Sequence, residues 1–145
     1  MDGSNDPTLT PEGFQRADQL AYVLKNVKLD AIYDTPYKRT KLTVKPIADI
    51  LGKEIQTIPS LKKEDLSKFV DEALLKHKGE KILIASHSNI VPALIKLIRQ
   101  KEFEMRTMKS LEDSAYDDLF MVVFTNREKA QIFNLKYGEQ TPGKN

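Results

Sequence analysis

Two short segments carry the residue types that bind or transfer an anionic group. Ser86-His87-Ser88-Asn89 follows the apolar run 82–85 and precedes a helical pattern, and His87 is one of two histidines in the chain. Arg39 follows another short apolar run, again at the start of a helical pattern. An arginine offers a planar set of donors that matches phosphate oxygens. A histidine in such a place can act as donor, acid, base or phosphoryl carrier.

Each of these residues also has a plain structural interpretation. Ser88 or Asn89 is equally well explained as the cap of the following helix, and a single histidine in a turn is more often a hydrogen-bonded structural residue. Arg39 is by default part of a solvated basic helix face. The second histidine, His77, lies between two lysines, and we expect it to be exposed at a helix end.

Two acidic segments are weaker candidates. Glu64 and Asp65 follow a predicted strand, where a general acid is conceivable, but acids in the first turn of a helix are favoured by the helix dipole alone. Tyr116-Asp117-Asp118 is compatible with a loop over a site and equally with a solvated lead into a strand.

The elements that position these residues alternate along the chain. Apolar spacing and capping residues predict helices over 10–25, 37–51, 66–78 and 89–99, and strands over 31–33, 54–58 and 82–85. Residues 119–125 and 130–136 are predicted to form a hairpin that adds antiparallel strands at one side. The alternation predicts an α/β fold in three layers, a mostly parallel sheet with helices on both faces. Ligands of such sheets bind beyond the carboxyl ends of the strands, which would bring Arg39 and His87 together.

Composition narrows the function classes. The 145 residues fit one domain, 1–145, and a net charge of +2 without a basic stripe argues against nucleic acid as the main partner. The absence of cysteine excludes disulfides and thiol chemistry. No apolar run approaches the roughly 20 residues of a membrane span, so we expect no membrane partner. The opening residues do not have the pattern of a signal peptide.

The order of several motifs resembles the histidine phosphatase superfamily, the phosphoglycerate-mutase-like phosphatases. The motifs are Leu9-Thr10-Pro11-Glu12-Gly13, Tyr33-Asp34-Thr35-Pro36 with Arg39 and Thr43, Ser86-His87-Ser88-Asn89, and Tyr137-Gly138. The chain looks most similar to the small branch whose members open with Arg-His-Ala-Glu. The resemblance implies hydrolysis of phosphate monoesters through a phosphohistidine, without metal or other cofactor. It also implies that Arg39 binds phosphate, that His87 is the second histidine, donating to phosphoryl oxygens, and that Ser88 lies beside them.

One part of the family pattern is missing from this sequence. The Arg-His motif with the nucleophilic histidine should precede Leu9, but residues 1–7 match only the loop that follows it. The resemblance therefore implies that the nucleophile and the first strand are absent, and Ser86 replaces the usual glycine before the second histidine. We expect a chain that is inactive or impaired.

Two explanations of this pattern remain open. The chain is either an N-terminally truncated phosphatase, which the well-kept motifs favour, or a non-catalytic anion-binding or protein-interaction module on the same fold. The expected partner is a phosphorylated small molecule or a phosphate or sulfate anion. An unpaired sheet edge would favour a homodimer. A missing N-terminal segment leaves room for a secretion signal, so localisation stays open.

Overall fold

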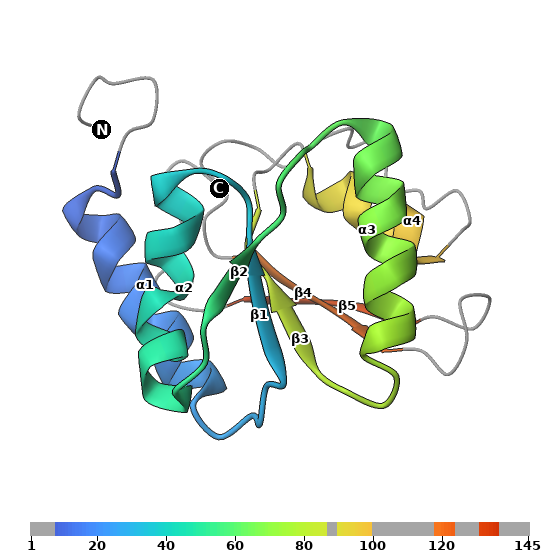
Figure 1. Cartoon of the computed structure of the whole chain (residues 1–145). Coiled ribbons are helices and arrows are strands. Elements are labelled where there is room, and N and C mark those ends of the chain that lie inside the picture. Colours follow the sequence, from blue (N-terminus) through green and yellow to red (C-terminus); the bar gives the residue numbers. More distant parts are fainter. Residues whose placement is uncertain (1–7, 87–89, 100–117, 124–130, 137–145) are drawn as a thin grey trace. The chain divides into compact units, whose positions relative to one another are not determined.

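The computed structural model describes residues 8–86, 90–99, 118–123 and 131–136. These residues belong to two compact units, residues 8–61 and 77–86 in the first and residues 62–76, 90–99, 118–123 and 131–136 in the second. Figure 1 labels their helices and strands. Within these ranges, no helix has both the length and the apolar character needed to cross a membrane.

The first unit is built on a parallel three-stranded sheet. Its strands are β1 (Ala31–Asp34), β2 (Ile55–Thr57) and β3 (Ile82–Ile84), and β1 lies in the centre in the order β2-β1-β3. Ile32 pairs with Ile55 on one side and with Leu83 on the other. Because neighbouring parallel strands run in the same direction, all three carboxyl ends lie at one edge of this sheet.

Two helices of the first unit begin and end where the sequence predicts. α1 (Pro11–Leu24) starts after Thr10, whose side-chain oxygen accepts a hydrogen bond from the Gly13 amide at 3.1 Å. α2 (Lys38–Leu51) ends at Gly52, which has a left-handed backbone with φ of 64°. Pro46 lies inside α2, and the helix continues through it without interruption.

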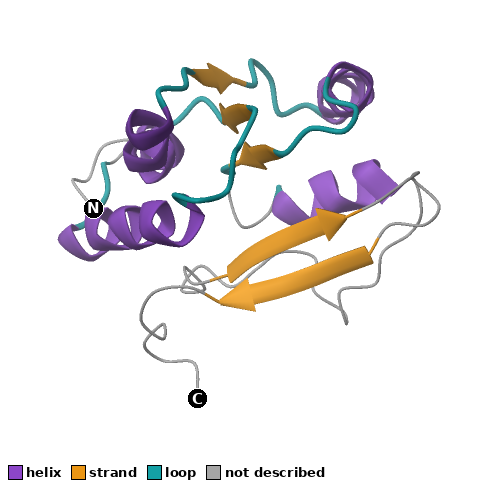
Figure 2. Cartoon of the chain, turned by 90° about the horizontal axis from the view of Figure 1, so that it is seen from below, coloured by secondary structure: helices purple, strands orange, loops and turns teal. Residues whose placement is uncertain are grey.

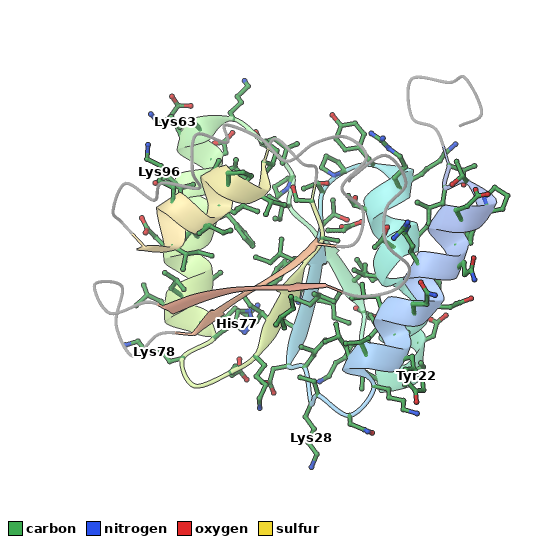
Figure 3. All side chains as sticks on the ribbon, turned by 180° about the vertical axis from the view of Figure 1, so that it is seen from behind. Tyr22, Lys28, Lys63, His77, Lys78 and Lys96 are labelled. Carbon is green, nitrogen blue, oxygen red and sulfur yellow. The ribbon has the colours of Figure 1, made fainter. Side chains whose placement is uncertain are left out.

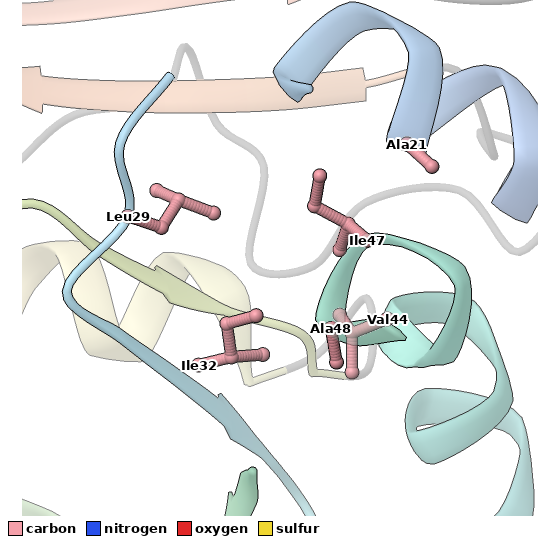
Figure 4. Packing of buried hydrophobic residues seen from close by; sticks show 6 residues of the cluster. All are labelled: Ala21, Leu29, Ile32, Val44, Ile47 and Ala48. Atoms are coloured by element: carbon pink, nitrogen blue, oxygen red, sulfur yellow. The ribbon is translucent and has the colours of Figure 1, made fainter. Parts of the chain in front are cut away.

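The hydrophobic core of this unit lies between the two helices and one face of the sheet. Figure 4 shows six buried residues that form it, namely Ala21, Leu29, Ile32, Val44, Ile47 and Ala48. Ile55 and Leu83, the register partners of Ile32, pack against this cluster from the flanking strands. The face of β1 that carries Ile32 is therefore the face that α2 covers.

The second unit contains α3 (Lys63–Lys76), α4 (Val91–Arg99), β4 (Asp118–Val123) and β5 (Gln131–Lys136). The two helices pack on each other, and Leu66 and Val70 of α3 and Leu94 and Ile95 of α4 are buried. β4 and β5 are antiparallel, with Met121 opposite Phe133 (Figure 2).

The predicted α/β class with a parallel sheet is confirmed. The predicted antiparallel pair is also present, as the two-stranded sheet β4-β5. Its predicted place at one side of the parallel sheet concerns both units and stays a prediction. The charged stretch 101–118 is predicted from the sequence to be a surface loop. Residues 101–117 lie outside the described residues, and Asp118 begins β4. The predictions of a single domain and of helices on both faces of the sheet concern both units. The prediction of a missing first strand concerns the start of the chain. All three stay predictions.

Candidate anion site

The carboxyl ends of the three strands are held together by backbone hydrogen bonds that extend past the strands. The Ile58 amide donates to the Asp34 carbonyl at 2.8 Å, and the Ala85 amide donates to the Tyr33 carbonyl at 2.9 Å. Asp34 at the end of β1 therefore has a fixed position between the ends of its two neighbours, and Ser86 follows directly after the bonded Ala85. Side chains at these two strand ends share one edge of the sheet.

The first turn of α2 is tied to the end of β1 by Thr40. Its buried hydroxyl lies 2.8 Å from the Thr35 carbonyl and 3.1 Å from the Tyr37 carbonyl, and it accepts a hydrogen bond from the Thr35 hydroxyl at 3.2 Å. This arrangement fixes the turn between strand and helix, and with it the position of Arg39 in the first helical turn.

The amino end of α2 is electropositive. Tyr37 occupies the capping position without a side-chain hydrogen bond to the helix, and the first turn contains no acidic residue. The unpaired amides of a helix start carry a partial positive charge, and Arg39 adds a full one. The combination favours an anion at this edge.

Four side-chain atoms in the first unit are buried without a hydrogen-bond partner in the described structure. They are both carboxyl oxygens of Asp34, Nε of Arg39 and Oγ of Ser86. Such atoms are rare in native proteins and indicate a role in function or a missing ligand. All three residues come from the two strand ends and the helix start described above.

The predicted site residues have different outcomes. Arg39 lies at the carboxyl edge and is partly buried instead of being a solvated surface arginine. His87 and Ser88 lie outside the described residues, so their positions stay predictions. Sequence reasoning quoted Asp34 within a motif but gave it no role of its own, and its side chain has no exposed surface. The signal available was a carboxylate directly after a buried apolar run.

The prediction that His77 is exposed is wrong. His77, labelled in Figure 3, follows α3, and 7% of its side chain is exposed. Its Nδ1 lies 2.7 Å from the Glu80 carboxylate and its Nε2 lies 2.8 Å from the Tyr33 hydroxyl. Because a carboxylate only accepts hydrogen bonds, Nδ1 donates to Glu80, and in the neutral ring Nε2 accepts from Tyr33. Burial, and secondly the charge of Glu80, raise the pKa of the Tyr33 hydroxyl.

The other acidic candidates gain no support as catalytic groups. Glu64 and Asp65 are exposed in the first turn of α3, as expected of acids placed for the helix dipole. Tyr116 and Asp117 lie outside the described residues. Among the described residues, no three histidine, aspartate or glutamate side chains gather closely enough to hold a metal ion.

Comparison with known proteins supports the resemblance seen in the motifs. The family model of the histidine phosphatase superfamily (branch 1) matches residues 1–69. No curated protein matches the sequence.

Several solved structures share the fold. A mycobacterial glucosyl-3-phosphoglycerate phosphatase in complex with VO3 superposes with a TM-score of 0.66 at 11% identity, covering 92% of this chain and 88% of that one. A phosphoserine phosphatase from Entamoeba histolytica in complex with 3-phosphoglyceric acid gives 0.61 at 17% identity, with 97% and 88% covered. Phosphoglycerate mutase from Plasmodium falciparum gives 0.59 at 22% identity, with 89% and 84% covered.

The motif order, the family match and the structural neighbours agree. The resemblance predicted from the sequence is therefore confirmed: residues 1–69 match the histidine phosphatase superfamily, and the chain has the phosphoglycerate-mutase-like fold.

Proposed function

We propose that this chain binds the phosphoryl group of phosphorylated small molecules at the carboxyl edge of its parallel sheet. The observation that carries the proposal is Arg39, whose Nε is buried without a partner at the electropositive start of α2. A buried guanidinium nitrogen that lacks an acceptor favours an oxyanion. Two of the structural neighbours were solved with 3-phosphoglyceric acid and with VO3, which are ligands of the same chemical class.

In this proposal, Arg39 donates to two phosphoryl oxygens, and the segment after β3 donates to the others. His87 and Ser88 directly follow Ser86 in the sequence, at the neighbouring strand end. His87 acts as the donor to the phosphoryl group, the role that the family resemblance gives to the second histidine. No metal or organic cofactor is needed for this binding.

The same proposal has a consequence for catalysis. Transfer through a phosphohistidine needs a nucleophilic imidazole besides the supporting one. The sequence contains only His77 and His87, and both ring nitrogens of His77 are engaged with Glu80 and Tyr33. If His87 is the supporting histidine, these 145 residues contain no free imidazole to carry the phosphoryl group. We therefore expect binding with little or no hydrolysis.

Titration calorimetry with inorganic phosphate tests the binding. Replacing Arg39 with alanine removes charged hydrogen bonds and should weaken phosphate binding by about tenfold or more. Lys53→Ala is a matched control, because it removes an exposed positive charge just beyond the opposite end of α2. Absence of phosphate binding, or equal effects of the two variants, contradicts the proposal.

A hydrolysis assay with a generic phosphomonoester tests the second part. We expect no turnover above background for these 145 residues. A non-catalytic binding module on the same fold is the alternative, and the coding DNA upstream distinguishes the two. An in-frame segment with an Arg-His motif, together with activity of the extended protein, favours a truncated phosphatase, whereas an upstream stop codon favours the binding module.

A further inference from the structure

The proposed anion site contains a negative group that phosphate binding alone does not explain. The Asp34 side chain has no exposed surface, and neither of its carboxyl oxygens has a hydrogen-bond partner in the described structure. Leaving a buried carboxyl group without partners is costly. A bound water molecule, an ion or a ligand at this position would supply the missing partner.

The direction of the Asp34 side chain follows from its strand. Alternate residues of a strand point to the same face, so Asp34 shares the face of Ile32, which packs against Val44 and Ile47 of α2. The chain turns directly from Asp34 into α2, and Thr40 ties the two together. Asp34 therefore faces the first turn of α2, where Arg39 and the helix amides attract an anion.

A carboxylate beside an anion site discriminates between oxyanions. It repels an oxyanion that has lost all of its protons, because two negative oxygens without a hydrogen between them cannot form a hydrogen bond. An oxyanion that keeps one proton can donate it to the carboxylate and present its other oxygens to the donors. Ser86 Oγ, at the neighbouring strand end, is also without a partner and can serve either as donor or as acceptor.

We propose that Asp34 selects protonated phosphoryl groups, by accepting a hydrogen bond from the ligand's P–O–H group while Arg39 donates to its unprotonated oxygens. The inference rests on the phosphate binding proposed above and adds a selectivity to it. The site takes the monoanion of a phosphomonoester and rejects its dianion and sulfate. No covalent step is involved, and the proton stays on the ligand.

The ionisation of the ligand provides the test. A phosphomonoester loses its second proton near pH 6, whereas sulfate carries no proton at any pH in the range of the experiment. Calorimetry with methyl phosphate and with sulfate, from about pH 5.5 to 8, should show methyl phosphate binding more weakly as the pH rises. At the low end of this range we expect methyl phosphate to bind on the order of tenfold more tightly than sulfate.

Other charged groups near Asp34 must be separated from this effect. Lys38, Arg39 and Lys41 lie in the first turn of α2, and His87 follows the end of β3 in the sequence. A protonated histidine strengthens binding of any anion. The ratio of the methyl phosphate and sulfate affinities removes this common contribution, so the ratio is the quantity to follow.

Asp34→Asn is the matched variant, because its amide can donate a hydrogen bond to a fully ionised oxygen. The ratio should then lose its pH dependence, and sulfate should bind at least as tightly as methyl phosphate. Circular dichroism shows whether this variant folds, and the measurements on the unaltered chain test the proposal even if it does not. Equal, parallel binding of both anions by the unaltered chain overturns the role of Asp34 alone. Failure of both anions to bind overturns the proposed function as well.

Discussion

The Thr40 hydroxyl is expected to control both the stability of the first unit and the position of Arg39. It lies within hydrogen-bond distance of the carbonyls of Thr35 and Tyr37 and accepts from the Thr35 hydroxyl. Thr40→Val keeps the shape of the side chain and removes all of these bonds. The perturbation therefore isolates the polar connection between β1 and α2 from the packing around it.

The size of the effect follows from what the change leaves behind. Thr35 has no exposed surface. In Thr40→Val its buried hydroxyl loses the Thr40 acceptor, and its carbonyl, which keeps the Tyr37 amide, loses one donor. Removing one partner of a buried hydrogen bond costs about 1–3 kcal/mol, and we take about 2 kcal/mol for this site. With a urea m value of about 2 kcal/mol per molar, the midpoint of unfolding falls by about 1 M.

Thr43→Val is the matched control on the same helix. The Thr43 hydroxyl donates to the Arg39 carbonyl at 2.7 Å, and this carbonyl retains its position in the helical hydrogen-bond ladder when the hydroxyl is removed. We expect a change below about 0.5 kcal/mol for this variant. Urea unfolding followed by circular dichroism measures both. Equal shifts in the two variants would refute the argument that Thr40 joins strand to helix, and so would unchanged phosphate affinity in a destabilised Thr40→Val.

Three further predictions test the core, a helix end and a buried hydroxyl. Ile47→Ala in the core should lower the free energy of unfolding by about 2–5 kcal/mol. Ile50→Ala on the exposed side of α2 should change it by less than about 1 kcal/mol. Similar urea midpoints for the two variants would contradict the assigned core. Gly52→Ala should cost about 1–2 kcal/mol, because Gly52 has a positive φ, and an unchanged midpoint would argue against the left-handed helix end. Because the pKa of Tyr33 is raised, its contribution to stability is present below about pH 10 and lost as the pH rises through the folded-state pKa. The urea midpoint of the unaltered chain should therefore fall more steeply above about pH 10 than that of Tyr33→Phe, and parallel curves would contradict this.

The elements of the first unit could be predicted from the sequence because their signals are local. Thr10 before Pro11 marks the start of α1, and Gly52 marks the end of α2, both through backbone requirements that operate within a few residues. The apolar run before Asp34 likewise predicts β1. Arg39 could be placed at the sheet edge for the same reason, since it lies one helical turn beyond a strand end.

The surroundings of His77 and Asp34 could not be predicted in this way. His77 lies between two lysines in the sequence, which suggests exposure, but its ring bonds to Tyr33, 44 residues away. Asp34 precedes a turn, where an aspartate is usually solvated, yet it is buried because β2 and β3 flank it on both sides. Both outcomes depend on strand order, which single-residue patterns do not contain.

The strand order also explains why, in the proposed site, side chains would recognise the phosphoryl group. At the carboxyl edge, the Tyr33 and Asp34 carbonyls are already bonded to the amides of Ala85 and Ile58, so these two amides cannot bind a ligand. Among the described residues of the first unit, the buried side-chain atoms left without a partner are Arg39 Nε, Ser86 Oγ and the two Asp34 carboxyl oxygens. In the proposed site, the affinity comes from Arg39 and the selectivity from Asp34. Losing the arginine should therefore weaken all oxyanions together, whereas changing the aspartate should reorder them.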